Sequence, residues 1–304
     1  MKILILKLNA TGDVVRTTPL LRCLEGEITW VTALKNIALL DRLSGNLRSV
    51  SWEDRDAVRN QEYDLVINLE DEIEIAAFAR EIEPKQLFGA YLGENDTVSY
   101  TDDARRWFDM SIISRYGKTQ ADALKFNNRK TYQQLIFEGL NLRFTGQKYL
   151  LPEAQYTGLY GDVAIAPVAG AVWPMKNWAF YDRLRQQLEA AGLKVNVLPA
   201  RESLLEHLGD VQNHRCLVSG DSLPMHLALG SAIPCVSLFS CTSPWEIHDY
   251  GIQTKLISPL LPEFFYRRDF DRRATAAISA NDVFAATMRQ VSGAASVVTE
   301  DAVS

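Results

Sequence analysis

Residues 2–21, KILILKLNATGDVVRTTPLL, join an apolar run to a glycine–aspartate turn and a threonine–proline stretch. The β-branched run of residues 2–8 is typical of a strand buried on both faces of a parallel sheet. The turn leads into a helix, which either starts near Asp13 and is kinked at Pro19 or begins with Thr18 as its cap. An open α/β sheet presents its chemistry at such strand ends, so this turn is the first candidate site.

The same strand-then-helix pattern recurs in both halves of the chain. Further strands are predicted at 28–32, 64–69, 163–166, 195–198, 216–219 and 235–239, helices at 180–192 and 223–230, and a polar helical region at 102–141. This alternation predicts an α/β fold with two doubly wound, Rossmann-like domains that face an interdomain cleft. We expect an N-terminal domain at 1–152, a linker at 149–158, a C-terminal domain at 160–290 and a flexible tail at 291–304.

Composition excludes several classes of protein. The 304 residues carry a net charge of −6, whereas a nucleic-acid-binding domain is normally basic. The four cysteines form no Cys-x-x-Cys pair, which favours a reduced, cytoplasmic chain without a zinc site. We expect no signal peptide and no membrane helix, because no run approaches ~18 uncharged apolar residues. Contact with the inner face of a membrane stays open.

Residues 218–244, VSGDSLPMHLALGSAIPCVSLFSCTSP, predict an anion site in the second half. A strand ends at Ser219, Gly220 permits a tight turn, and Asp221 and Ser222 open a helix. A helix start presents unpaired backbone N–H groups, and the hydroxyls after the next strand add donors, which suits a diphosphate. The alternative is that Asp221 and Ser222 only cap the helix, which is worth ~1 kcal/mol.

Three more polar residues lie close to predicted strand ends or helix starts, and each has two interpretations. Lys176, before the helix at 180–192, either contacts a phosphate as a point charge or is an exposed lysine between two tryptophans. Glu202, after the strand at 195–198, either pairs with ribose hydroxyls or is a first-turn glutamate that the helix dipole favours. His226 faces either the cleft or the core. The other histidines form no ligand spacing with it, so no metal site is expected.

Asp13 explains why the first turn is not a phosphate loop. A dinucleotide-binding turn would carry Gly-x-Gly-x-x-Gly, whereas residues 9–13 read NATGD, with one glycine and a carboxylate. A carboxylate at a strand end can accept a proton from a nucleophilic alcohol. The alternative is an aspartate that only caps the helix.

Together these stretches resemble glycosyltransferase family 9, the ADP-heptose heptosyltransferases and their relatives. Residues 1–21 are similar to the family's N-terminal strand and Gly-Asp turn, and residues 64–72, DLVINLEDE, to its second landmark. Residues 220–244 resemble its Asp-Thr-Gly-x-x-His-x-Ala block followed by Phe-Gly-Pro-Thr-x-Pro. The resemblance implies a GT-B fold, with the acceptor on the N-terminal domain and the nucleotide-sugar on the C-terminal domain.

The resemblance also implies a reaction and a set of residues. The reaction is an inverting, metal-independent transfer of a sugar, heptose from ADP-heptose, to a hydroxyl of a glycan or glycolipid, with no cofactor beyond the nucleotide-sugar substrate. The family's general base corresponds to Asp13, and the basic residue that assists the diphosphate corresponds to Lys176. The implied donor-binding residues are Glu202, Asp221, Ser222, Met225, His226 and Thr242, and the implied acceptor-binding residues are Asn9, Thr11, Gly12 and Arg16.

Two departures from the family pattern leave alternatives open. Ser222-Leu223 replaces the family's Thr-Gly, and Ser240-Cys241 replaces its Gly-Pro. The alternatives are a transferase that uses another nucleotide-sugar for a capsule or small-molecule acceptor, and a catalytically silent sugar-nucleotide-binding protein. Residues 264–273, FFYRRDFDRR, are either a solvated loop or a contact for an anionic acceptor or a membrane surface.

Overall fold

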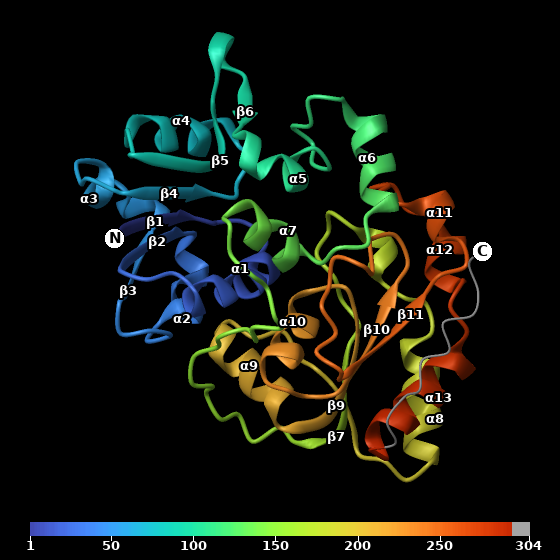
Figure 1. Cartoon of the computed structure of the whole chain (residues 1–304). Coiled ribbons are helices and arrows are strands. Elements are labelled where there is room, and N and C mark those ends of the chain that lie inside the picture. Colours follow the sequence, from blue (N-terminus) through green and yellow to red (C-terminus); the bar gives the residue numbers. More distant parts are fainter. Residues whose placement is uncertain (294–304) are drawn as a thin grey trace. The chain divides into compact units, whose positions relative to one another are not determined.

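The chain folds into two compact units, each built on its own sheet (Figure 1). The structure, a computed structural model, describes residues 1–293. Unit 1 comprises Met1–Glu153 together with Trp245–His248, and unit 2 comprises Ala154–Pro244 and the described residues from Asp249 to 293. Residues 294–304 of the predicted tail lie outside the described residues, whereas residue 291 completes the last helix.

Unit 1 contains a six-stranded sheet of order β3-β2-β1-β4-β5-β6, in which only β6 is antiparallel to its neighbour. Its strands are β1 (Lys2–Leu6), β2 (Glu27–Thr32), β3 (Leu47–Ser51), β4 (Leu65–Asn68), β5 (Gln86–Leu92) and β6 (Val98–Tyr100). Its helices are α1 (Thr11–Thr17), α2 (Ile37–Leu40), α3 (Asp56–Arg59), α4 (Ile73–Glu81), α5 (Arg105–Phe108), α6 (Lys118–Asn127) and α7 (Tyr132–Gly139).

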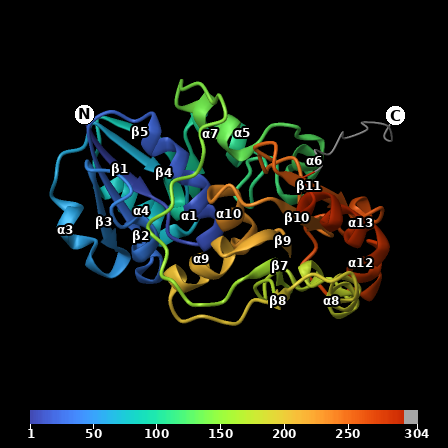
Figure 2. The ribbon, with the colours of Figure 1, turned by 90° about the horizontal axis from the view of Figure 1, so that it is seen from below.

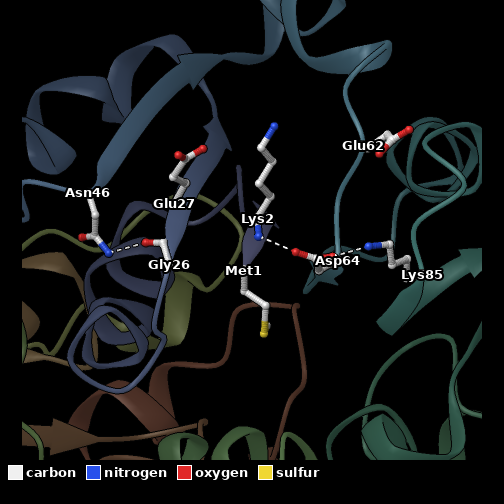
Figure 3. Close-up of a pocket in the computed structure, with 8 residues that line it drawn as sticks. All are labelled: Met1, Lys2, Gly26, Glu27, Asn46, Glu62, Asp64 and Lys85. Carbon is white, nitrogen blue, oxygen red and sulfur yellow. Dashed lines mark hydrogen bonds and ion pairs between the residues drawn. The ribbon is translucent and has the colours of Figure 1, made fainter.

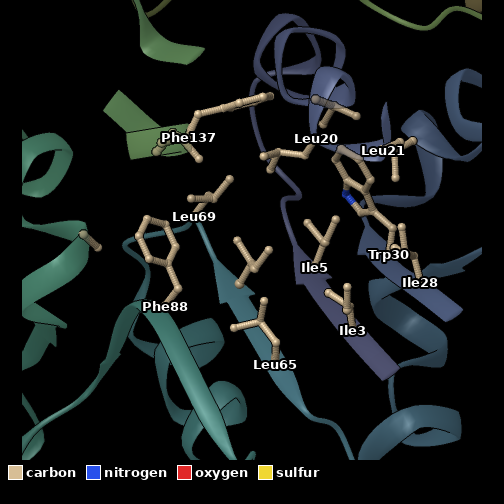
Figure 4. Packing of buried hydrophobic residues seen from close by; sticks show 14 of the residues in the cluster. Ile3, Ile5, Leu20, Leu21, Ile28, Trp30, Leu65, Leu69, Phe88 and Phe137 are labelled. Carbon is tan, nitrogen blue, oxygen red and sulfur yellow. The ribbon is translucent and has the colours of Figure 1, made fainter. Parts of the chain in front are cut away.

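The sheet of unit 1 is buried on both faces because successive residues of β1 point in opposite directions. Ile3 and Ile5 pack with Leu20 and Phe137 in one apolar cluster, beneath the segments around α1 and α7 (Figure 4). Leu4 and Leu6 belong to a second cluster with Val31 and Val66, which the apolar side of α4 covers. A continuous apolar strand can be buried in this way only if helices cover both faces.

Unit 2 contains a five-stranded parallel sheet of order β11-β10-β9-β7-β8. Its strands are β7 (Gly161–Ala166), β8 (Val195–Val197), β9 (His214–Gly220), β10 (Cys235–Phe239) and β11 (Gln253–Ile257). Its helices are α8 (Tyr181–Ala190), α9 (Leu204–Gln212), α10 (Leu223–Gly230), α11 (Leu261–Phe264), α12 (Arg272–Ala276) and α13 (Ala280–Val291).

Helices cover both faces of the unit 2 sheet as well. Helices α8 and α13 pack together on one face, where Leu184 and Val283 join the strand residues Val163 and Val218 in one cluster. Helices α9 and α10 pack together on the other face (Figure 2). Both units are therefore doubly wound α/β structures, which confirms the fold class expected from the sequence.

Several predicted elements need correction. The helix after the first turn starts at Thr11 and continues at Thr18–Arg22 as a tighter 3₁₀ turn that contains Pro19. The region 102–141 is broken into α5, α6 and α7, and it is not polar throughout, because α7 buries Leu135, Ile136 and Phe137. Strands β3, β5, β6 and β11 were not predicted. Three of them lie at sheet edges, and β5 contains a glycine, so their apolar runs are short or interrupted.

Candidate functional site

In unit 1 the site forms where β1 and its neighbour β4 end, because parallel neighbours finish at the same edge of the sheet. Lys7 follows β1 and Glu70 lies just beyond β4. Ala10 then takes a left-handed backbone conformation (φ 54°), and its carbonyl accepts a hydrogen bond from the Asp13 N–H at 2.6 Å. A left-handed alanine costs roughly 1–2 kcal/mol, and it brings the first turn of α1, with Asp13, back over the end of β1.

The ammonium group of Lys7 lies within ion-pair distance of the carboxylates of both Glu70 and Asp13. The Nζ atom lies 2.8 Å from Oε1 of Glu70 and 3.7 Å from Oδ2 of Asp13. Burial alone would lower the pKa of Lys7, but the charges of Glu70 and Asp13 raise it above its ordinary value, so the side chain is a buried cation. Burial raises the pKa of Glu70, and the charge of Lys7 and its hydrogen bond oppose that rise.

Arg16 is the second cation beside Asp13. Its Nε lies 3.0 Å from Oδ1 of Asp13, one turn back along the helix, and its Nη1 lies 3.8 Å from Oε2 of Glu246. The guanidinium also stacks on the ring of Tyr132 at 4.1 Å from the centroid. Although Asp13 thus contacts two cations, its side chain keeps 31% of its surface exposed.

The backbone of this turn is already occupied by an internal anion. The N–H groups of Leu8 and Asn9 both donate to Oε1 of Glu70, at 2.6 and 2.8 Å. In a phosphate-binding turn such N–H groups would be directed at the ligand. Here the two N–H groups bind Glu70 instead, and these hydrogen bonds hold the turn that leads to Asp13 against the segment after β4.

The residues predicted to bind an acceptor lie around Asp13. Asn9 is exposed, and its amide donates to Glu72 at 2.7 Å. Thr11 donates to the side chain of Asn36 at 2.9 Å, and Gly12 is partly exposed in the first turn of α1. Arg16 is buried against Tyr132, so of these residues it is the one most engaged within the protein.

In unit 2 a second polar cluster forms at the ends of the adjacent strands β7, β9 and β10. Lys176 Nζ lies 2.9 Å from Oδ2 of Asp221 and donates to the Asp221 carbonyl at 2.7 Å, and Thr242 Oγ1 donates to the same carboxylate at 2.7 Å. Burial would raise the pKa of Asp221, but the charges of Lys176 and His226 and both hydrogen bonds lower it to about 2. Three predicted donor-side residues therefore meet around one ionised carboxylate.

Asp221 and Ser222 do not act as simple helix caps. Ser222 occupies the cap position of α10, but its hydroxyl donates to the Gly220 carbonyl at 3.4 Å and accepts no cap hydrogen bond among the described residues. The Asp221 carboxylate is held by Lys176 and Thr242. The capping alternative is therefore wrong here, and the first N–H groups of α10 lack a side-chain partner at the cap.

The remaining predicted donor residues are placed differently. His226 is buried on α10, near enough to Asp221 to affect its pKa. Met225 has no exposed surface and is a core residue in this structure. Glu202 is exposed and precedes Ser203, the cap of α9, so it is not a first-turn glutamate of that helix.

Sequence reasoning assigned no role to Lys7, Glu70, Tyr132 or Glu246. Lys7 was only the residue that interrupts an apolar run, and Glu70 was only part of a motif. The signal that could have found them is that a cation and an acid each directly follow a buried strand. Glu246 could not have been found, because it reaches Arg16 from a segment more than 200 residues away.

A surface pocket lies at the opposite, amino-terminal edge of the unit 1 sheet (Figure 3). Its lining residues are Met1, Lys2, Gly26, Glu27, Asn46, Glu62, Asp64 and Lys85. Asp64 is held there by the Lys2 N–H and the Lys85 ammonium, at 2.8 and 2.7 Å. Ligands of open α/β sheets bind at the carboxyl ends of the strands, so this pocket is not the candidate site.

The described residues show neither a metal-binding cluster nor a membrane-spanning helix. No three His, Cys, Asp or Glu side chains gather there as a metal site would require. Within residues 1–293, none of the helices combines the length and the apolar character that crossing a membrane demands.

Two doubly wound units of this kind define the GT-B class of fold. Three similar solved structures are a family 9 glycosyltransferase from Veillonella parvula DSM 2008, the E. coli heptosyltransferase WaaC with ADP, and the E. coli ADP-heptose lps heptosyltransferase II. Each is 16% identical to this chain, with TM-scores of 0.61, 0.62 and 0.62, and they cover 96%, 95% and 96% of it. The matches span 97%, 100% and 99% of the three neighbours.

The sequence comparisons add no family assignment. No protein-family model matches the chain. No curated protein sequence is significantly similar to it. The structural likeness therefore establishes the fold, and the resemblance to glycosyltransferase family 9 read from the motifs is confirmed at the level of that fold.

Proposed function

We propose that the chain is an inverting, metal-independent glycosyltransferase that moves a sugar, heptose from ADP-heptose, to a hydroxyl of a glycan or glycolipid. The observation that carries the proposal is the position of Asp13, a partly exposed carboxylate at the end of the first strand of a GT-B fold. The similar structures include the E. coli heptosyltransferase WaaC with ADP and the E. coli ADP-heptose lps heptosyltransferase II, which supports an ADP-linked donor.

In the proposed mechanism Asp13 is the general base. The acceptor hydroxyl gives its proton to the Asp13 carboxylate while its oxygen forms a new bond to the anomeric carbon of the donor. The bond from that carbon to the diphosphate oxygen breaks on the opposite face, so the configuration inverts and the nucleoside diphosphate leaves. The carboxylate stays ionised before the reaction because Lys7 and Arg16 stabilise its charge.

The leaving diphosphate would be stabilised by unit 2. Lys176 and the N–H groups at the start of α10 supply positive charge, and Thr242 supplies a hydroxyl. Lys176 is held by Asp221, so we infer that a donor phosphate bound there shares this ammonium with Asp221. Glu202, Ser222 and His226 remain proposed donor contacts.

Replacing Asp13 by asparagine tests the proposal. Asp13→Asn is expected to lower kcat for transfer by ~10²–10⁴-fold, because a general base is lost. Donor binding, read as the rise in melting temperature with ADP-heptose, is expected to be retained. Near-normal turnover in Asp13→Asn would contradict the role of the carboxylate.

The same transfer assay separates the alternatives. Turnover of GDP- or UDP-sugars but not ADP-sugars would replace the proposed donor, and binding without transfer or hydrolysis would indicate a silent sugar-nucleotide-binding protein. One observation disfavours the catalytically silent sugar-nucleotide-binding protein. Cys241, at a departure from the family pattern, lies inside a core cluster with Met175 and Phe264, and burial raises its pKa to about 11. The charges of Lys176 and Asp221 also affect the pKa of Cys241, so this residue adjoins the polar cluster, and the contacts among Lys176, Asp221 and Thr242 form with the cysteine in place.

A further inference from the structure

Each of the two cations beside Asp13 also faces a second carboxylate. Lys7 contacts Glu70, and Arg16 contacts Glu246. This pairing matters for a general base. A carboxylate that alone receives the charge of two neighbouring cations has a strongly lowered pKa and accepts a proton poorly. The second carboxylates therefore decide how strong a base Asp13 can be.

The distances show that Lys7 is bound more closely by Glu70. The Lys7 ammonium is 2.8 Å from Glu70 and 3.7 Å from Asp13, and Glu70 is almost completely buried. Coulombic attraction falls with distance and is stronger away from water, so Lys7 interacts more strongly with Glu70 than with Asp13. The negative charge of Glu70 thereby offsets part of the positive potential that Lys7 exerts on Asp13. Without that charge, Asp13 would be the remaining carboxylate within ion-pair distance of Lys7 among the described residues.

Glu70 also fixes the backbone that carries Asp13. Its Oε1 accepts the N–H groups of Leu8 and Asn9 in addition to the Lys7 ammonium. The turn continues through the left-handed Ala10 into the helix that holds Asp13. One carboxylate oxygen thus sets both the geometry of the turn and the electrostatic surroundings of Asp13.

We propose that Glu70 is a positioning residue that shares the charge of Lys7 and thereby keeps Asp13 able to accept a proton. The proposal rests on the proposed function, in which Asp13 is the general base. The charged and titratable groups that surround this part of unit 1 are Lys7, Arg16, Glu70, Asp71, Lys125, Tyr132 and Glu246. Glu70 is the one among them that bonds both Lys7 and the turn.

The test replaces Glu70 by its neutral isostere. In Glu70→Gln the amide oxygen can still accept from Leu8 and Asn9, but Lys7 is left with Asp13. We expect the pKa of Asp13 to fall by ~1 unit. It can be measured by NMR titration of aspartate labelled with ¹³C at the carboxyl carbon, with the Asp13 signal assigned from its loss in Asp13→Asn. The acid limb of the kcat/KM profile should move to lower pH by the same amount, and kcat should fall several-fold.

A matched control lies two residues further along the chain. Glu72 accepts a hydrogen bond from the side chain of Asn9 at 2.7 Å and is exposed, so Glu72→Gln removes a charge from the same segment after β4 without touching the Lys7 contact. It should leave the Asp13 pKa unchanged. Glu70→Asp keeps the charge and should keep the Asp13 pKa near its wild-type value, even if the shorter side chain lowers stability.

The results distinguish the two proposals. An unchanged Asp13 pKa in folded Glu70→Gln, or equal shifts in Glu70→Gln and Glu72→Gln, would overturn the role of Glu70. If Glu70→Gln does not fold, a lowered Asp13 pKa in Glu70→Asp comparable to one unit would overturn it too. The titration needs no substrate, so it decides this role even if the wild-type chain transfers no sugar, an outcome that would instead refute the proposed function.

Discussion

Asp221 illustrates how single residues in this protein hold charge away from water. Its carboxylate is largely covered, yet Lys176 and Thr242 lower its pKa to about 2. A buried ion pair of this kind is destabilising if one partner is removed, because the other charge stays desolvated. The pair is therefore expected to couple the stability of unit 2 to pH.

The first prediction concerns this pair. The pKa of Asp221 lies below its ordinary value of 3.8, so its contribution to stability is present above about pH 4 and is lost as the pH falls toward 2. Asp221→Asn is expected to lower the unfolding free energy of unit 2 at pH 7 by about 2 kcal/mol, and the difference should shrink toward pH 2. Urea-dependent hydrogen exchange of unit 2 peptides measures this unit separately.

Asp269→Asn is the control for Asp221→Asn. Asp269 pairs with Arg267 at the surface, where water screens the charges, so its replacement should cause no resolvable change. A constant stability difference between wild type and Asp221→Asn from pH 7 to pH 2 would show that the pKa of Asp221 is the same in the folded and unfolded states, and would contradict the lowered value.

At the scale of elements, β5 depends on one glycine. Gly89 has a φ of +107°, and a Cβ built on it would lie 1.8 Å from the Asn68 carbonyl oxygen of β4. Asn68 in turn donates its side-chain amide to the Ala90 carbonyl at 2.8 Å. The close approach of the two backbones therefore explains why an isolated glycine stands within a buried strand.

Gly89→Ala is accordingly predicted to be among the most damaging conservative changes. The residue would be strained and β4 and β5 would have to separate, which we expect to cost ~3 kcal/mol or more. Thermal unfolding or expression as soluble protein measures it. Gly45→Ala, where a Cβ meets no atom within 4 Å, should be near neutral. Similar stabilities of the two variants would contradict the close approach.

The elements also show what a sequence reveals. Strands β1, β4, β7, β9 and β10 were predictable because they are continuous apolar runs, and their order in the sheets brings Lys7 to Glu70 and Lys176 to Asp221. Periodicity gives no information on which strand neighbours which. The edge strand β11, QTKLI, is half polar because it has one neighbour, so its pattern resembles a loop.

For the surface of the molecule as a whole, two arginines of the segment 264–273 form ion pairs with acidic residues of the same protein. Arg267 pairs with Asp269, and Arg273 pairs with Asp271 and Glu263. Arg268 lies over the ring of Trp173, with its guanidinium carbon 5.3 Å from the centroid. In a chain whose net charge is −6, these contacts favour a solvated loop over a surface for anionic lipid.

We therefore predict that the wild-type chain does not sediment with vesicles, whether or not they contain anionic lipid. Free basic residues near such a surface are worth ~1 kcal/mol each. The triple variant Glu263→Gln/Asp269→Asn/Asp271→Asn removes the acidic partners of Arg267 and Arg273, and it should sediment measurably with the anionic vesicles only. Sedimentation of the wild type with anionic vesicles would restore the interpretation as a membrane contact.

The late segment Trp245–His248 has a consequence for synthesis. Its Glu246 carbonyl accepts the N–H of Tyr132 at 2.9 Å, and Trp245 stacks under Arg129 at 3.8 Å. When the first 153 residues have emerged from the ribosome, the segment Trp245–His248 that completes unit 1 has therefore not yet been synthesised. These contacts of unit 1 can form only after most of the C-terminal half has been translated, although N-terminal domains commonly fold first. An expression fragment cut at the linker would carry the same gap permanently.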